Sequence, residues 1–261
     1  MEELPPIVET PPPAPKAPTM SLAARLLNVF AIPGDVFEEV QATHHSAVNW
    51  LVPALIASVV GAVSAFLMFS QPTIQQQLRE KQERLMEQQV TAGKMTRAQA
   101  DEALAVAEKF TGPTMLKTFG AFSAVGASFA RVFWWALILW LLSRWFLKVP
   151  IGYLKAAEVA GLAGMIATLG VIVTLLLIVN LGKLFSTPSL ALTISDFDEK
   201  NKSHLLLGAV NVFNFWFVGV LASGLARLAR VPFVRAAFLV LGYWLAWSLI
   251  LIFIGLGTLA M

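Results

Sequence analysis

The sequence contains no cysteine, and only 13% of its 261 residues are charged. The absence of cysteine excludes disulfides, thiolate metal sites and cysteine nucleophiles. An ordinary soluble domain carries about 25% charged residues, so the scarcity of charge argues against a water-soluble fold. Hydrophobic residues instead make up 57% of the chain, and its mean hydropathy is +0.71. We therefore expect an all-α, polytopic integral membrane protein.

The familiar motifs of enzymes are also missing. The chain has no phosphate-binding glycine loop, no His-Glu-x-x-His, no Gly-x-Ser-x-Gly and no paired carboxylates within a hydrophobic segment. The loop with Asp196, Asp198 and Glu199 lacks the glycine and the bidentate acid of a calcium-binding loop. A membrane enzyme would have only Glu158 and this acidic loop as candidates, and they lie far apart in the sequence. We expect no catalytic residues, no metal and no cofactor.

Five segments are long and apolar enough to cross a bilayer. The clearest, 161–181, has no charged residue and reaches roughly 30 Å at 1.5 Å of helix rise per residue. Ala160 and Gly164, at four-residue spacing, predict close packing against another helix. The five predicted spans, within a membrane domain over 48–257, lie at about 49–70, 121–147, 159–181, 205–226 and 233–256.

The residues before the first span are expected to form two regions. Residues 1–20 are rich in proline, which is typical of a disordered tail. Apolar residues then recur at helical spacing over 21–47 and predict two short amphipathic helices on the cytoplasmic membrane surface, with Glu38 and Glu39 facing water. We expect their apolar side chains to contact lipid or a protein partner, through Leu22, Leu26, Phe30 and Phe37.

The polar segment 71–117, between the first two spans, predicts a helical hairpin. Gly93 marks its turn, and Thr96 with Gln99 has the spacing of a capping box that opens the second helix. Acidic and basic residues are nearly balanced in this segment, which is typical of a solvated surface rather than a nucleic-acid site. The net charge of the whole chain is only +3, so we expect no nucleic-acid partner.

One arginine interrupts the second span. Arg131 either reaches a headgroup layer by snorkelling, as Arg144 does thirteen residues later, or lies near the midplane of the bilayer. In the second case it would need a partner and would mark a functional site.

Three asparagines lie in or beside the predicted spans. Asn180, near the end of the third span, is expected to cap its helix, with ligand binding as the alternative. Asn211 and Asn214 lie one helical turn apart in the fourth span and are followed by Trp216. We expect these amides to hydrogen-bond a neighbouring helix, because polar groups in lipid need partners, and again a bound ligand is the alternative.

Charge in the short loops predicts the orientation. The turns after the second and fourth spans are basic and almost free of acids, so they and the N-terminus are expected to face the cytoplasm. Five spans then place the hairpin and the C-terminus on the other side. The lysines and arginines of the hairpin itself favour the opposite orientation, which leaves its side open.

The order of these parts resembles the Yip family, the Ypt/Rab-interacting membrane proteins and their bacterial relatives. The similarity covers about 21–256 and rests on Pro33 with Val36 and Phe37, on Gly152 with Tyr153, and on Asn211, Phe213 and Trp216. The insertion is of the type seen in bacterial members, and the acidic-leucine-tyrosine-glycine-proline motif of eukaryotic trafficking members is absent at 32–35. The resemblance implies five helices, no known catalytic residues and, for a bacterial member, a place in the inner membrane.

Two functions follow from these expectations. The first is a non-enzymatic membrane adaptor or organiser that acts through lipid and protein contacts, including self-association of its spanning helices. The alternative is a small oligomeric transporter or channel whose polar path is lined by Arg131 and the intramembrane asparagines.

Overall fold

The computed structural model describes residues 19–260, apart from the side chains of residues 110, 111, 259 and 260. Residues 1–18 of the expected proline-rich tail lie outside this range. The described chain is helical and has no β-strand, although an isolated bridge joins Ser189 to Asn211. Five of its helices are long and apolar enough to cross a membrane. The expected all-α, polytopic fold is therefore confirmed.

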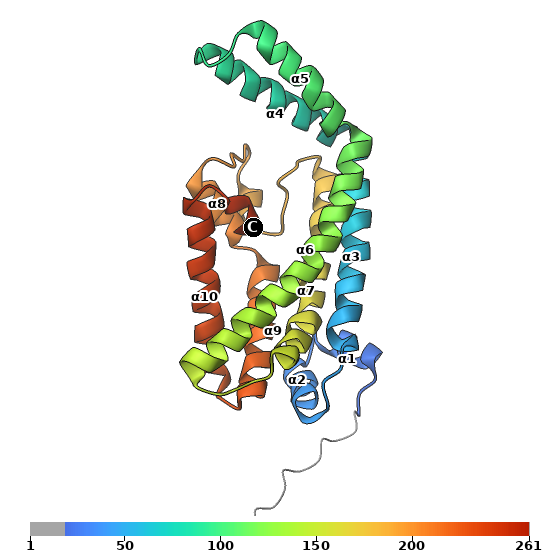
Figure 1. Cartoon of the computed structure of the whole chain (residues 1–261), viewed down its shortest axis with the longest axis vertical. Helices are drawn as coiled ribbons and strands as arrows, with labels where there is room; N and C mark the ends of the chain where they lie inside the picture. The colour runs from blue at the N-terminus through green and yellow to red at the C-terminus, as the bar shows by residue number, and fades with distance from the viewer. Residues whose placement is uncertain (1–18, 261) are drawn as a thin grey trace, which may run out of the picture.

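The five long helices form one bundle (Figure 1). They are α3 (Val48–Met68), α6 (Pro113–Leu142), α7 (Tyr153–Leu181), α9 (Val212–Ala229) and α10 (Phe233–Phe253). Helices α3, α6 and α7 pack on one another, and α9 lies between α7 and α10. Helix α6 crosses the bundle obliquely and continues into a π-helical turn, η1 (Ser143–Leu147). The buried core is densest around the first half of α7, where Ala156, Ala157 and Ala163 are fully buried.

The insertion forms the expected hairpin, which projects beyond one end of the bundle (Figure 1). Its helices are α4 (Pro72–Thr91) and α5 (Arg97–Thr111). The capping box is present, because the Thr96 hydroxyl accepts from the Gln99 amide and the Gln99 side chain accepts from the Thr96 amide. Helix α4 is also tied to the 182–201 loop, through an ion pair of 2.5 Å between Lys81 and Glu199.

The fourth span differs from the expectation of one helix over 205–226. The chain forms a short helix α8 (Lys202–Ala209), breaks, and restarts as α9 at Val212. Two backbone hydrogen bonds cause the break, since Val210 accepts from Leu190 at 3.2 Å and Val212 donates to Pro188 at 3.3 Å. Residues 210–212 are thereby paired with the preceding loop, which includes a 3-10 turn η2 (Leu190–Thr193), and cannot continue a helix.

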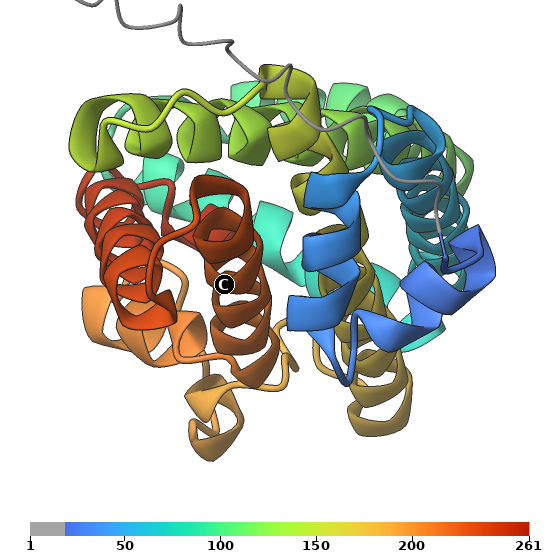
Figure 2. The ribbon, with the colours of Figure 1, turned by 90° about the horizontal axis from the view of Figure 1, so that it is seen from below.

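Two short helices, α1 (Leu22–Asn28) and α2 (Pro33–Ala42), lie at the end of the bundle opposite the hairpin (Figures 1 and 2). Helix α2 packs against α9 and α7, and its residues Val36, Phe37 and Val40 are fully buried. Phe37 was expected to contact lipid or a partner, and that prediction is wrong. The apolar face of α2 completes the core of the bundle instead of lying on a membrane surface.

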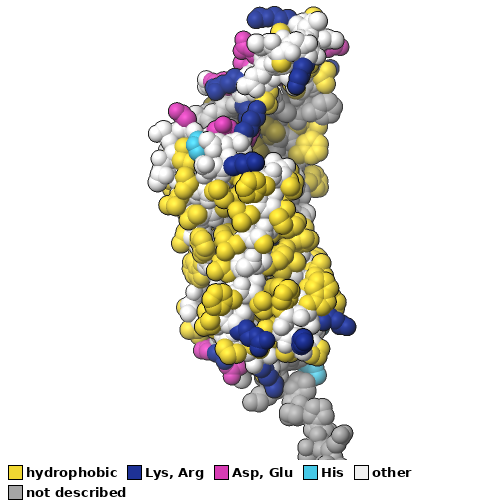
Figure 3. Space-filling model, turned by 90° about the vertical axis from the view of Figure 1, so that its left-hand side faces the viewer, with side chains coloured by type: hydrophobic (Ala, Val, Ile, Leu, Met, Phe, Trp, Pro, Cys, Tyr) yellow, Lys and Arg dark blue, Asp and Glu magenta, His cyan; other side chains and the backbone are white. Residues whose placement is uncertain are grey.

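Hydrophobic side chains also dominate the outside of the bundle. Figure 3 shows them gathered over the middle of one face, with lysine and arginine side chains toward its two ends. The most exposed large residues include Phe122 and Phe238, each 74% exposed. Such a surface is stable only against hydrocarbon, so the protein is an integral membrane protein whose spanning helices contact lipid.

Candidate functional site

Four polar side chains are buried where α1, α2, α3 and α7 meet. Glu158 is fully buried in the first turns of α7, and Asn49 is fully buried in the first turn of α3. The side chains of Arg25 and Glu39 are only 6% and 9% exposed, because α2 turns Glu39 inward beside its apolar face. Buried polar groups are costly unless they are hydrogen-bonded, so the partners of these four decide what the cluster does.

A continuous chain of hydrogen bonds joins the four residues. The Arg25 guanidinium pairs with Glu39 (Nη2 to Oε1, 2.8 Å) and donates to Asn49 (Nη1 to Oδ1, 3.1 Å). The Asn49 amide nitrogen then donates to Glu158 Oε2 at 2.5 Å. The Asn49 side chain thus bridges the Arg25 guanidinium and the Glu158 carboxylate, and both its amide oxygen and its amide nitrogen are hydrogen-bonded. We call Arg25, Glu39, Asn49, Lys155 and Glu158 the N-terminal charge network.

Lys155 closes the network at Glu158. Its ammonium lies 3.0 Å from Glu158 Oε1 and also donates to two carbonyls, that of Val40 in the last turn of α2 at 2.6 Å and that of His44 just after the helix at 3.1 Å. The amide of Ser46 donates to the same Glu158 oxygen at 3.2 Å. Two acids and two bases therefore neutralise each other, and both oxygens of Glu158 are satisfied without water.

Glu39 is equally well bound at the other end. Besides Arg25, it accepts from the amides of Thr19 and Met20, both at 2.9 Å, and from the Thr19 hydroxyl at 3.0 Å. Burial raises the pKa of Glu39, but the hydrogen bond and charge of Arg25 and the bonds from Met20 and Thr19 outweigh it. The pKa of Glu39 is consequently below its ordinary value, and the carboxylate stays charged at neutral pH.

Sequence reasoning missed this network. Glu39 was expected to face water, and Glu158 was considered only as part of an enzyme site. The available signal was the spacing of Lys155 and Glu158, three residues apart at the start of an apolar span, where neighbouring side chains on a helix can pair. The pairing of Arg25 with Glu39 and Asn49 depends on how α1 and α2 fold back on the bundle. The spacing of these residues in the sequence does not predict this pairing.

The asparagines singled out from the sequence lie at two levels of the bundle: Asn180 is near the hairpin end, while Asn211 and Asn214 are at the start of α9, where Phe213 lies against Gly170 in the middle of α7. Asn180, in the last turn of α7, donates to the carbonyl of Leu176 in its own helix at 2.7 Å. Asn211 caps α9 by accepting from the amide of Phe213 at 2.9 Å, and Asn214 lies in the turn that follows. Asn211 therefore serves its own helix end and not a neighbouring helix.

The aromatic and apolar candidates are held against the bundle. Trp216 contacts the ring of Phe30 with centroids 5.9 Å apart, and Leu26 and Phe30 pack on the core. Leu22 is partly exposed. The most exposed apolar residue of α1 is Leu27, at 71%.

Arg131 is in the middle of α6. It has 18 helical residues before it and 16 after it through the end of η1. Within the described part of the chain it makes no hydrogen bond or ion pair.

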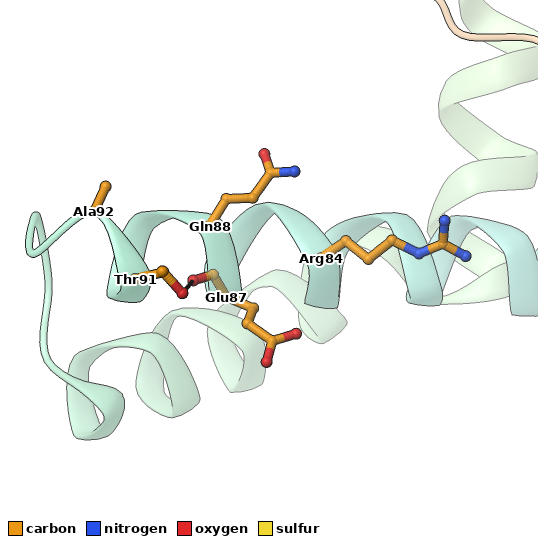
Figure 4. A pocket seen from close by; sticks show the side chains of 5 residues that line it. All are labelled: Arg84, Glu87, Gln88, Thr91 and Ala92. Atoms are coloured by element: carbon orange, nitrogen blue, oxygen red, sulfur yellow. Dashed lines mark hydrogen bonds between the residues drawn. The ribbon is translucent and has the colours of Figure 1, made fainter.

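An open cavity of about 420 Å³ lies along α4 (Figure 4). Its lining side chains all come from this one helix, and the bond from the Thr91 hydroxyl to the Glu87 carbonyl, 2.9 Å, is internal to it. No second element contributes a reacting or binding group there. Across the described residues, no three histidines, cysteines or acids are grouped to hold a metal ion.

Comparison with known proteins places this arrangement in a family. Neither the curated proteins nor the solved structures give a match to the chain. A family model described as the Yip1 domain matches residues 27–257, which include α2, all five long helices and most of the N-terminal charge network. The chain belongs to the Yip family.

Proposed function

We propose that this protein is a non-enzymatic membrane adaptor whose α1 and α2 form a fixed platform for a protein partner. The single observation that carries the proposal is the N-terminal charge network. A free amphipathic segment would need no buried ion pairs, whereas Arg25, Glu39 and Glu158 hold α1 and α2 to α3 and α7 in one geometry. Buried polar networks of this kind favour a single defined arrangement over looser alternatives.

The platform has an exposed apolar side. Leu27 is 71% exposed and Ile32 is 44% exposed, while their neighbours Val29 and Phe37 are buried. The buried residues fix the platform, and the exposed ones are available to a partner. Leu22, in the first turn of α1, is also partly exposed.

The charge pattern supports a cytoplasmic location for this platform in a bacterial inner membrane. The α6–α7 and α9–α10 connections lie at the same end as α1 and α2 (Figure 1). Exposed basic residues lie in or directly beside these connections, among them Arg144, Lys148 and Arg235. Spanning proteins retain such residues on the cytoplasmic side.

The transport alternative has less support from the geometry. Asn180 and Asn211 are helix-terminal residues whose side chains hydrogen-bond the backbone of their own helices. A polar path would require these groups to face one another across the bundle.

Photocrosslinking in native membranes tests the adaptor proposal. A photoreactive residue at Leu27 should give one discrete protein adduct, whereas the same residue at Val59, which is 64% exposed on the membrane face of α3, should give lipid adducts alone. The platform is expected to loosen in Asn49→Leu, because this change leaves Arg25 and Glu158 short of a partner, so the Leu27 adduct should fall severalfold.

Two results would count against the adaptor. Lipid adducts alone at Leu27 would indicate a protein that shapes the membrane rather than one that binds a partner. An adduct unchanged by Asn49→Leu would mean that the network does not hold the platform in its binding geometry.

A further inference from the structure

Arg131 lies midway between the basic residues near the two ends of the second spanning segment, α6 and η1. Lys117 lies 14 residues before it and Arg144 lies 13 residues after it, or roughly 20 Å along the helix in each direction. Both of these residues rest on aromatic rings near the ends of the bundle, Lys117 on Phe66 at 4.8 Å and Arg144 on Trp140 at 5.5 Å. Such contacts are typical of side chains at the membrane interface, which puts Arg131 midway between the two interfaces.

Among the described residues, the guanidinium of Arg131 has no counter-charge. No ion pair or hydrogen bond to it is present among the described residues, and a charge at this depth is costly unless it is paired. The only acid within any spanning helix is Glu158, and Lys155 and Asn49 already occupy both of its oxygens. A second copy of the chain would therefore bring no free carboxylate to this depth.

The surface beside Arg131 is shaped for a helix. Ser123, Ala127 and Arg131 follow one another at four-residue spacing, and Gly126 and Ala130 lie next to them; all four small residues are exposed. A Cβ added to Gly126 would meet no atom within 4 Å. Exposed small residues in a spanning helix allow another helix backbone to approach closely.

The small residues on the adjoining side of α6, which faces α3, already have this role inside the protein. Gly120 faces Ala65 of α3, and Ala124 faces Gly61, each so closely that a Cβ on the glycine would lie 2.8 Å from the alanine Cβ. Helix α6 therefore carries two small-residue faces. The side with Gly120 and Ala124 is filled by α3, the side with the exposed small residues is open, and the partly exposed Arg131 lies where the two sides meet.

We propose that the open face of α6 binds a spanning helix of a different membrane protein, and that an aspartate or glutamate in that helix pairs with Arg131. An aspartate or glutamate in the middle of a partner's spanning helix is already at the depth of Arg131, so no charged group has to move into the membrane to meet it. A lipid phosphate would have to leave the headgroup layer and travel roughly 20 Å along α6, so the observations favour a helix over a lipid. This surface on α6 is separate from the platform formed by α1 and α2.

Photocrosslinking from within the membrane tests this inference. A photoreactive residue at Ala127 in the full chain, in native membranes, should yield an adduct whose partner has an acid in the middle of a span. In Arg131→Gln the adduct should fall about tenfold, as expected for loss of a charged partner in a span. Arg144→Gln, at the exposed end of the same helix, is the matched control and should leave the adduct unchanged.

A charge exchange identifies the paired acid. Arg131→Glu should abolish the adduct, and replacing the partner's acid with arginine should restore it. The inference is wrong if Ala127 gives only lipid adducts, if its adducts are copies of this chain, or if Arg131→Gln leaves the yield unchanged. Folding is checked separately, because purified Arg131→Gln should unfold at a temperature no lower than the unchanged protein when the partner is absent.

Discussion

At the scale of single residues, the N-terminal charge network explains how this membrane protein can bury the carboxylates of Glu39 and Glu158. Glu158 would be expensive alone, but Lys155 and Asn49 are placed by α7 and α3 to meet both of its oxygens. Arg25 and Asn49 extend the pairing to Glu39. Each residue makes the burial of the next one tolerable, so we expect the network to fail as a unit.

The lowered pKa of Glu39 gives a test by pH. A carboxylate with a lowered pKa stabilises the folded state above its unfolded value of 4.5, and this stability is lost as pH falls through the lower folded value. Glu39→Gln should therefore cost about 2 kcal/mol at pH 7 and progressively less below pH 4.5. Thermal unfolding of both proteins in detergent measures the difference.

The neighbouring acid is the matched control for Glu39. Glu38 is 64% exposed and pairs only with the exposed Arg227, so Glu38→Gln should change the unfolding temperature little at any pH. Equal effects of the two substitutions would mean that the buried pairing of Arg25 with Glu39 does not stabilise the fold.

At the scale of elements, the contact between α3 and α7 depends on one glycine. A Cβ on Gly161 would overlap the Cα of Trp50 and lie 2.8 Å from the carbonyl oxygen of Asn49. The start of α3 would have to move away from α7, which would also pull Asn49 from Glu158. Gly161→Ala should thus destabilise the protein by about 1–3 kcal/mol.

Gly164, one turn further along α7, provides the control. A Cβ there would meet nothing within 4 Å, so Gly164→Ala should be neutral or slightly stabilising through better helix propensity. Unfolding temperatures in detergent distinguish the two substitutions. A Gly161→Ala protein as stable as the Gly164→Ala protein would contradict the close approach of α3 and α7.

The same pair of glycines indicates how much of the elements was predictable. Hydropathy and caps predicted five long helices and the hairpin, because these depend on local composition. The sequence also predicted small residues on α7, but it favoured Ala160 and Gly164 for the close contact, whereas Gly161 makes it with Trp50. Which face of a helix meets a neighbour, like the pairing of Arg25, depends on long-range packing that periodicity in an all-apolar span does not encode.

At the scale of the whole molecule, the two ends of the bundle are chemically different. The end with α1 and α2 has the buried network and the basic connections, while the other end carries the projecting hairpin and the 182–201 loop (Figure 1). The hairpin end is close to charge balance, with Lys81 paired to Glu199 and Arg84 to Glu80. The molecule is therefore polarised along the membrane normal, and the two proposed contact surfaces lie at different depths, one at an end and one in the middle of α6.

This polarity predicts the orientation, and the absence of native cysteine makes it directly measurable. A single cysteine at Lys94, exposed in the hairpin turn, should react with a membrane-impermeant maleimide in right-side-out vesicles. A cysteine at Arg235, exposed in the first turn of α10, should react only after the vesicles are opened. Retention of basic residues on the cytoplasmic side is the physical reason for this asymmetry. The reverse labelling pattern would place α1, α2 and Leu27 outside the cell, where a cytoplasmic partner could not reach the platform. The proposed pairing of Arg131, in the middle of α6, does not depend on the orientation.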